Sequence, residues 1–239
     1  MSSKLQLLVL VAAFACALGA EKPVPAPGKT IIKVLIEGEQ NPPPPSSEFI
    51  FSFVGTVGMV FSGDNIVAFD TGVPKQRAAL CQALKAVGVK GKEVTHLVQS
   101  HTHGDHTGNA GMFEEAVFYA ATSKIVGYAF QFNVISKDNP TVQIDPNLKM
   151  VLTPGHAGGT ADKSLIVSNE ETYGKVAFVG DLFLNKDDIH DKPDAATFTN
   201  QDVVDSQKKI VCEEAVDYIV PGHGKIFQVT TDIKSKLGC

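Results

Sequence analysis

Candidate metal ligands are concentrated in one short stretch near the middle of the sequence. Six consecutive residues supply three imidazoles and one carboxylate, from His101, His103, Asp105 and His106. His101 and His103 are two residues apart on a segment expected to be extended, so their imidazoles project to the same side of the chain. Imidazole nitrogens with a carboxylate oxygen suit Zn²⁺, although the ligand types alone leave iron and manganese open. The stretch therefore predicts a metal site.

Three further candidate ligands follow at wide intervals along the chain. They are His156, Asp181 and His223, and a glycine precedes each of them. Glycine leaves the backbone free to turn tightly and lets a metal or a substrate approach. Each residue alone is a weak signal, because His and Asp beside glycine are common in turns. Their order after the dense stretch makes the combined pattern specific.

The ordered pattern H-x-H-x-D-H, then His, then Asp, then His resembles that of the metallo-β-lactamase superfamily. The resemblance covers nearly all of the chain after its amino terminus. It implies an α/β fold, an αββα sandwich of two mixed sheets flanked by helices, with the metals at one edge between the sheets. It also implies that Asp70 has a structural role in support of the metal loop. The ligand set that it implies is His101, His103 and His156 for one metal, Asp105, His106 and His223 for a second, and Asp181 as the bridge.

The chemistry implied by the resemblance is hydrolysis with one or two zinc ions per chain, two being favoured. Two divalent ions about 3.5–4 Å apart bring the pKa of a bridging water towards neutrality and polarise the bond under attack. A zinc-dependent hydrolase would then use a metal-bound hydroxide. Asp105 would orient that hydroxide and relay its proton, which makes Asp105 the expected catalytic residue.

Three functional hypotheses stay open. Segments 34–38, 100–109 and 219–227 are similar to those of a group of small animal proteins in the superfamily, which implies a homodimeric endoribonuclease acting on histone pre-messenger RNA in the cytosol or nucleus. The alternative is a secreted hydrolase of small esters, thioesters or lactones, of the glyoxalase II kind. A non-catalytic metal-binding or ligand-binding protein is the third.

The amino terminus has the order of a secretory signal peptide. Lys4 precedes an apolar run over residues 7–18, and small residues follow before the polar Glu21. This run is too short to span a bilayer comfortably, and three prolines soon after it oppose a continuing helix. We therefore expect a signal peptide over residues 1–20, one domain over 21–239, no transmembrane segment once the signal is removed, and secretion.

Composition limits the class of partner. The 239 residues carry 21 Lys and Arg against 26 Asp and Glu, a formal net charge of −5, so a dedicated polyanion-binding module is not expected, although a local basic groove could still bind RNA. Outside the signal the cysteines are Cys81, Cys212 and Cys239. One disulfide with a leftover thiol and three separate thiols both fit this odd number.

The apolar pattern alternates strands with a few helices. A helix is expected where Leu80, Ala83, Leu84 and Val87 share one face, a second helix is expected over 201–215, and an irregular proline-rich loop over 41–47. Strands are expected over 31–36, 49–62, 65–70, 96–100, 117–120, 150–153, 164–168, 175–179 and 218–220.

This arrangement puts every ligand motif at the end of a strand. His96 and His190 lie outside the ligand pattern, His96 as a core or sheet-edge residue and His190 in a polar loop. Cys212 is expected to be buried rather than a metal ligand.

Overall fold

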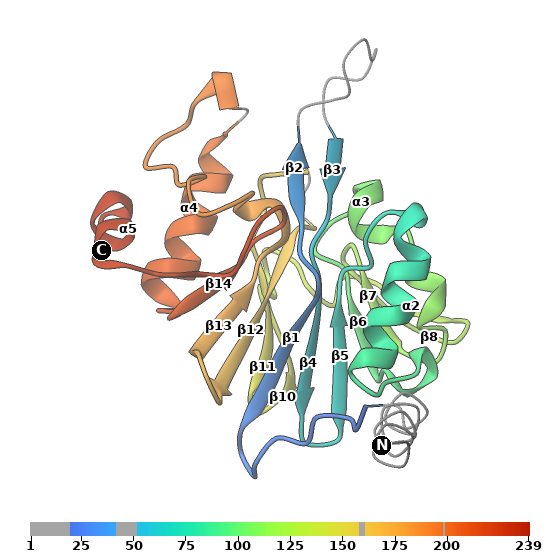
Figure 1. The fold of residues 1–239 in the computed structure, drawn as a ribbon. Helices are drawn as coiled ribbons and strands as arrows, with labels where there is room; N and C mark the ends of the chain where they lie inside the picture. The colour runs from blue at the N-terminus through green and yellow to red at the C-terminus, as the bar shows by residue number, and fades with distance from the viewer. Residues whose placement is uncertain (1–19, 42–51, 158–160, 198) are drawn as a thin grey trace, which may run out of the picture.

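The strands form two packed halves of a mixed β structure, flanked by helices (Figure 1). This computed structural model describes residues 20–41, 52–157, 161–197 and 199–239. The first half has the strand order β1-β4-β5-β6-β7-β8-β9, and in the second half β15, β14, β13, β12, β11 and β10 are neighbours in turn. A single parallel pair, Thr30 of β1 with Glu170 of β12, joins the halves.

The strands of the first half are β1 (Thr30–Ile36), β4 (Val57–Ser62), β5 (Asn65–Phe69), β6 (His96–Val98), β7 (Val117–Ala120), β8 (Ser123–Val126) and β9 (Ala129–Gln131). Those of the second half are β10 (Thr141–Asp145), β11 (Leu148–Leu152), β12 (Lys163–Glu170), β13 (Gly174–Phe178), β14 (Tyr218–Val220) and β15 (Phe227–Gln228). A separate pair is formed by β2 (Glu39–Asn41) and β3 (Ser52–Val54).

The α-helices are α2 (Arg77–Ala86), α3 (Gly104–Thr107), α4 (Gln201–Lys208) and α5 (Thr231–Leu237). A π-helical turn, η6 (Lys209–Glu213), continues α4. The short 3-10 turns are η1 (Pro74–Gln76), η2 (Gly91–Glu93), η3 (Ala110–Met112), η4 (Gly180–Leu182) and η5 (Ala195–Thr197).

Successive side chains of a strand point to opposite faces of the sheet, and this alternation produces the layers. In β4, Val60 joins the core between the two halves, whereas Met59 packs in the core beneath α2. In β12, Leu165 joins the central core, whereas Ile166 packs with the side chains of α4 and η6. Because successive side chains point to opposite faces of a strand, each half is covered on both sides. The expected αββα layering is confirmed, and the two expected sheets are continuous only through the Thr30–Glu170 pair.

The expected strand over 49–62 is wrong in one respect. The described part is split into β3 and β4 at Gly55 and Thr56. A Cβ on Gly55 would lie 2.2 Å from the carbonyl oxygen of Asp105, and the backbone N–H of Thr56 donates to Gly222 O at 2.8 Å. The chain therefore leaves the sheet here to pass over the loops that carry the candidate ligands.

Several other boundaries differ from the sequence expectations. The late helix ends as α4 at Lys208 and continues as η6 only to Glu213, short of residue 215. Strands β8, β9, β10 and β15 and helix α5 had not been predicted. Asn41 belongs to β2, while the rest of the expected proline-rich loop and residues 1–19 of the expected signal peptide lie outside the described residues.

The cysteines resolve into one disulfide and one free thiol. Cys212 of η6 is bonded to Cys239, 27 residues further on, and Cys81 is free and exposed. Of the two arrangements left open above, the structure has the first. Cys212 is half-buried and disulfide-bonded, and it is no metal ligand. The bond holds α5 against the second half of the fold.

None of the helices in the described part of the chain combines the length and the apolar character needed to span a bilayer.

We expect Cys239→Ser to lower the free energy of unfolding by about 3 kcal/mol, because the disulfide closes a loop that constrains the unfolded chain. Chemical denaturation measures the change. Cys81→Ser is the matched control, since that thiol is free and exposed, and it should leave the midpoint unchanged. Equal midpoints for the wild type and Cys239→Ser under oxidising conditions would contradict the stabilising role.

Candidate metal centre

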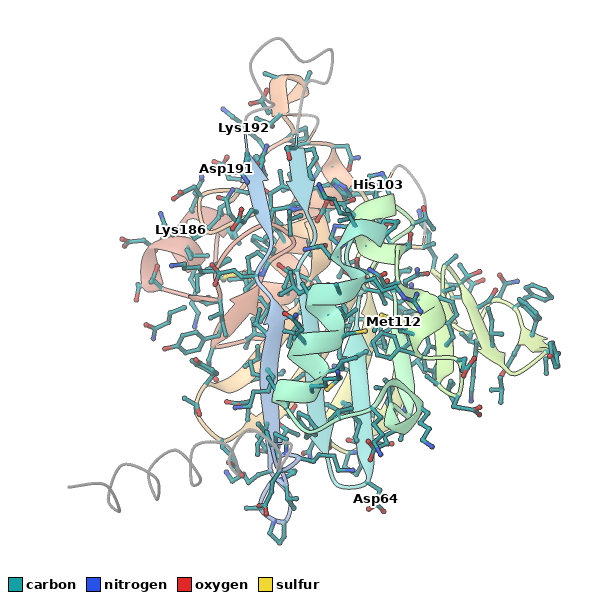
Figure 2. The ribbon with its side chains drawn as sticks, turned by 45° about the vertical axis from the view of Figure 1, so that its right-hand side comes forward. Asp64, His103, Met112, Lys186, Asp191 and Lys192 are labelled. Atoms are coloured by element: carbon teal, nitrogen blue, oxygen red, sulfur yellow. A yellow bond between two sulfur atoms is a disulfide. The ribbon has the colours of Figure 1, made fainter. Side chains whose placement is uncertain are left out.

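The candidate ligands meet at one end of the β structure, as the strand-end pattern predicted. His101 and His103 follow β6, His156 follows β11, Asp181 lies in η4 after β13, and His223 follows β14. Figure 2 shows His103 at the opposite end of the molecule from Asp64, which lies in the turn between β4 and β5. Residues up to 122 positions apart in the sequence thus come from both halves of the fold to one place.

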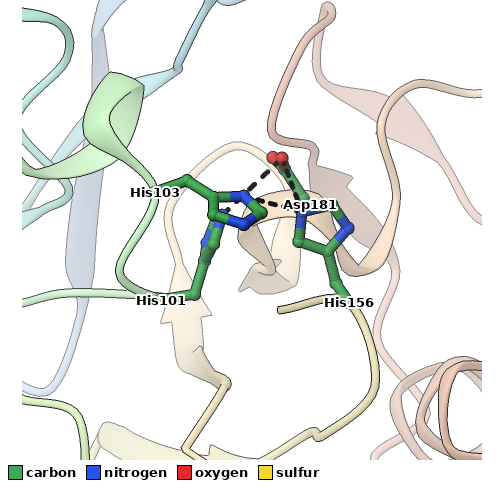
Figure 3. A group of neighbouring side chains, drawn as sticks. All are labelled: His101, His103, His156 and Asp181. Atoms are coloured by element: carbon green, nitrogen blue, oxygen red, sulfur yellow. Dashed lines mark hydrogen bonds and ion pairs between the residues drawn. The ribbon is translucent and has the colours of Figure 1, made fainter. Parts of the chain in front are cut away.

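The first cluster contains His101, His103, His156 and Asp181, with one ligand atom of each within 4.8 Å of the others (Figure 3). His156 Nε2 lies 3.1 Å from His103 Nδ1 and 3.2 Å from Asp181 Oδ2. His101 Nε2 lies 3.7 Å from the same carboxylate oxygen. Three imidazoles and a carboxylate therefore converge closely enough to hold a metal ion.

The second cluster contains Asp105, His106 and His223. Asp105 Oδ2 lies 3.4 Å from His106 Nε2 and 3.5 Å from His223 Nε2. Asp181 also reaches this cluster, with Oδ1 3.1 Å from His106 Nε2 and Oδ2 3.1 Å from His223 Nε2. The structure therefore brings together all seven candidate ligands, with Asp181 between the two groups. Their assignment as ligands stays a prediction.

Unpaired buried atoms at the centre of the group fit a cation. His101 Nε2, His106 Nε2 and Asp181 Oδ1 are buried and have no hydrogen-bond partner among the described residues. Leaving a buried polar atom unsatisfied costs about 1–3 kcal/mol. All three atoms can act as electron-pair donors, so a divalent ion would satisfy them together. The donor set, nitrogen with carboxylate oxygen, is of the kind that zinc takes.

Asp70 fixes which nitrogen of two imidazoles faces the centre. Its carboxylate accepts hydrogen bonds from Ser100 N and Ser100 Oγ at 2.7 Å and lies 2.8 Å from His106 Nδ1. Because the Ser100 hydroxyl donates to Asp70, it accepts from His101 Nδ1 at 2.9 Å. In the neutral form that binds a metal, both imidazoles then carry hydrogen on Nδ1 and present the lone pair of Nε2 inwards. Asp70 thus occupies the supporting position that the resemblance implied.

Charge is distributed unevenly between the two clusters. Burial, with the nearby His106, lowers the pKa of His101 to about 2, so its imidazole is neutral. Burial also opposes charge on His106, but the carboxylates of Asp70, Asp105 and Asp181 outweigh it and raise its pKa. The pKa of His223 is raised in the same way, because its hydrogen bond to Asp181 outweighs burial. A metal ion entering the second cluster must therefore displace protons.

Two glycines allow the backbone to pack closely against Asp181 and Ser100. A Cβ on Gly222 would lie 1.9 Å from Asp181 Oδ1, closer than any side chain can come. Gly180 has φ +53°, in the left-handed region, and a Cβ there would lie 2.5 Å from Ser100 Oγ. The close packing of the η4 turn against the ligand loops therefore requires glycine at both positions.

A cavity of about 500 Å³ opens onto the clusters. Its lining includes five of the candidate ligands, apolar residues and a further acidic and imidazole pair: Gln40, Phe53, His103, Asp105, His156, Asp181, Leu184, Asp188, His190, Ala196, Thr197, Thr199, Val203 and His223. Clefts of this size hold small molecules.

The two histidines outside the ligand pattern differ in position. His96 contacts Thr95 Oγ1 at 2.9 Å and stacks on Tyr119, as expected of a core or sheet-edge residue. His190 belongs to neither cluster, but it lines the cavity beside Asp188. The sequence did not predict that these two residues lie at the site. The spacing of Asp188 and His190, two residues apart in a polar loop, was the only signal that could have drawn attention to them.

We expect His101→Ala to reduce the zinc bound after dialysis by about one ion per chain, because it removes a ligand whose position Ser100 and Asp70 fix. Atomic absorption on the purified protein measures the ratio. His96→Ala is the matched control and should retain the wild-type ratio. An unchanged zinc content in His101→Ala would count against its role as a ligand.

Comparison with known proteins agrees with this geometry. The sequence model of the metallo-beta-lactamase superfamily matches residues 51–223. A human protein named metallo-beta-lactamase domain-containing protein 1 is 33% identical over 164 residues, 68% of this chain and 59% of that protein. An N-acyl homoserine lactonase of Bacillus cereus is 25% identical over 171 residues, 65% of this chain and 63% of that protein.

The match to a solved structure extends over most of the fold. The crystal structure of a putative metallo-beta-lactamase from Thermotoga maritima has a TM-score of 0.61 at 17% identity and covers 84% of this chain and 100% of its own. The chain spans between 52% and 64% of the length of the nematode, mouse, rat and human relatives that it matches. This chain belongs to the metallo-β-lactamase superfamily, a family of hydrolases that use divalent metals.

Proposed function

We propose that this protein is a zinc-dependent hydrolase of small, uncharged esters, thioesters or lactones. The cavity carries the proposal, because it joins the candidate ligands to an apolar wall that includes Phe53, Leu184 and Val203. Such a wall binds the hydrocarbon part of a small substrate by excluding water from it. The superfamily relative named as an N-acyl homoserine lactonase supports a lactone as one member of this class.

The chemistry requires a nucleophile from water and a polarised carbonyl. Zinc held by the two clusters would supply both, by lowering the pKa of water and by acting as a Lewis acid. Asp105 lines the cavity, and its side chain is 17% exposed, so its carboxylate can accept the proton that the attacking water loses. Asp70 and Ser100 hold the imidazoles of His101 and His106, and the Phe53 ring packs against His223.

The endoribonuclease expected from the resemblance remains a second proposal, and the charge around the cavity disfavours it. Among the described lining residues there is no lysine or arginine, whereas Asp105, Asp181 and Asp188 are present. Figure 2 shows Lys186 and Lys192 at the same end of the molecule as His103. Lys186 pairs with Asp187 at 2.7 Å, which reduces its attraction for phosphate. RNA binding draws on free basic groups, so an uncharged substrate fits this site better.

We expect Asp105→Asn to lower kcat/KM by at least about 100-fold, since the amide cannot accept a proton. The measurement is hydrolysis of a panel of nitrophenyl esters, a thioester and N-acyl lactones by the zinc-loaded protein, with and without a chelator. Asp64→Asn, an exposed carboxylate at the far end of the molecule, is the matched control and should be fully active.

A labelled single-stranded RNA in the same panel separates the other readings. RNA cleavage that is lost in Asp105→Asn and with the chelator, in the absence of ester or lactone hydrolysis, would replace the proposal with the endoribonuclease. Zinc-loaded protein that turns over nothing in the panel would replace it with a non-catalytic binding protein.

We also propose that the protein is secreted. The Cys212–Cys239 disulfide supports this, because structural disulfides persist in oxidising compartments and are rare where thiols are kept reduced. The order of charged, apolar and small residues over 1–20 supports it independently. The homodimer implied by the resemblance remains a separate prediction.

A reporter fused after residue 20 tests the proposed routing. We expect it in the culture medium, cleaved near the fusion point, because the apolar run is recognised as a signal. The control fusion carries Leu10→Arg, which interrupts the apolar run and should be retained in the cell. Retention of both fusions would contradict secretion.

A further inference from the structure

A second imidazole and carboxylate pair lines the cavity beside the candidate ligands. His190 Nε2 lies 2.6 Å from Asp188 Oδ1, and both residues belong to the lining but to neither metal cluster. We propose that His190, oriented by Asp188, is the general acid that protonates the leaving oxygen of the substrate. The inference rests on the hydrolase function proposed above and assigns it a residue for the leaving group.

Asp188 is fixed so that it can orient the ring. Its second carboxylate oxygen, Oδ2, accepts a hydrogen bond from the backbone N–H of Leu184 at 2.7 Å. Both oxygens are therefore engaged, one by the backbone and one by His190. The side chains of His190 and Asp188 are only 16% and 19% exposed, so their interaction is less screened by water than that of a surface ion pair.

The loop that carries the pair is held by one buried side chain. Gln207 of α4 is fully buried; its Oε1 accepts from the backbone N–H of His190 at 2.8 Å, and its Nε2 donates to the carbonyl of Asp188 at 2.9 Å. The same Nε2 donates to the carbonyl of Leu182 at 2.8 Å. Leu182 follows Asp181 directly in η4, so Gln207 links the backbone at the candidate ligand to the backbone of His190.

The hydrogen bonds leave one nitrogen of His190 for the substrate. Nε2 donates to Asp188, whereas Nδ1 makes no hydrogen bond to a described residue. With Nε2 engaged, Nδ1 is the atom that can hold and deliver a second proton. The Asp188 carboxylate offsets the positive charge that the ring then carries, as a carboxylate does for a catalytic histidine elsewhere.

The step balances as an ordinary hydrolysis. Water oxygen bonds to the carbonyl carbon and its proton passes to Asp105. The bond between that carbon and the leaving oxygen breaks, and the leaving oxygen takes the proton from His190 Nδ1. Solvent returns a proton from Asp105 to His190, so water and an ester give an acid and an alcohol, with no other reactant.

The test compares His190→Gln with the wild type on esters that share one acyl group and differ in the acidity of the leaving alcohol. For an alkyl ester, whose leaving group needs a proton, we expect kcat/KM to fall about 100-fold. For a nitrophenyl ester, whose leaving group departs as an anion, we expect a much smaller loss. His96→Gln, a histidine outside the cavity, should match the wild type on both, and Asp188→Asn should show the His190→Gln pattern more weakly.

Two outcomes overturn the proposal while leaving the hydrolase function intact. One is an equal loss on every leaving group, which would make His190 a positioning residue only. The other is no loss on any of them. Thermal melting and zinc content identify a variant that has failed to fold, and in that case Asp188→Asn alone must show the dependence on the leaving group.

Binding of a phosphonate monoester analogue gives a readout that does not need turnover. Calorimetry on the zinc-loaded proteins should show about 10-fold weaker binding to His190→Gln than to the wild type, about 1.4 kcal/mol, because a hydrogen bond to the leaving oxygen is lost. Equal affinities overturn the role of His190. A wild type that hydrolyses no ester overturns the hydrolase function, and the comparison of affinities then still decides whether His190 contacts a ligand. No binding by the wild type counts against both.

Discussion

The rest of the site depends on the Asp181 carboxylate, which contacts histidines from both halves of the fold. Its two oxygens lie within 3.7 Å of imidazole nitrogens from His101, His106, His156 and His223, and its side chain is only 5% exposed. Burial alone would raise the pKa of this carboxyl, but its hydrogen bonds to histidines hold that pKa well below its usual range. A buried anion of this kind is stable only while cations surround it. Without a metal the protons of His106 and His223 fill that role, and with a metal the ion does.

That constraint explains why the site lies at the strand ends. The histidines approach Asp181 from three different loops, which follow β6, β11 and β14, so these loops must leave the sheets at one edge. The packing of alternate residues such as Val60 and Leu165 in the central core aligns the two halves, and the loops then need only short turns. Glycine at positions 180 and 222 removes the side chains that would keep the backbone away from Asp181 and Ser100.

The sequence was sufficient to predict the layers and the meeting of the candidate ligands at the strand ends, while their roles as ligands stay predictions. His101 and His103 share a side through the two-residue period of an extended chain, and the apolar alternation in β4 and β12 sets the cores. The break at Gly55 was not predictable, because it follows from contact with Asp105, 50 residues away. One disulfide with a free thiol was one of two interpretations of the odd number of cysteines, and the pairing of Cys212 with Cys239 follows only from the packing of α5.

His190 was missed for a related reason. Its loop has no apolar period, and its position depends on hydrogen bonds to Gln207, which lies in the helix expected over 201–215. A buried glutamine has an amide that must be satisfied, and here its partners are the backbone groups of Leu182, Asp188 and His190. Helix α4 therefore contributes a buried polar side chain that holds the His190 loop, in addition to its apolar face. The buried Gln207 side chain thereby links the turn of Asp181 to the loop of the imidazole that would protonate the leaving group.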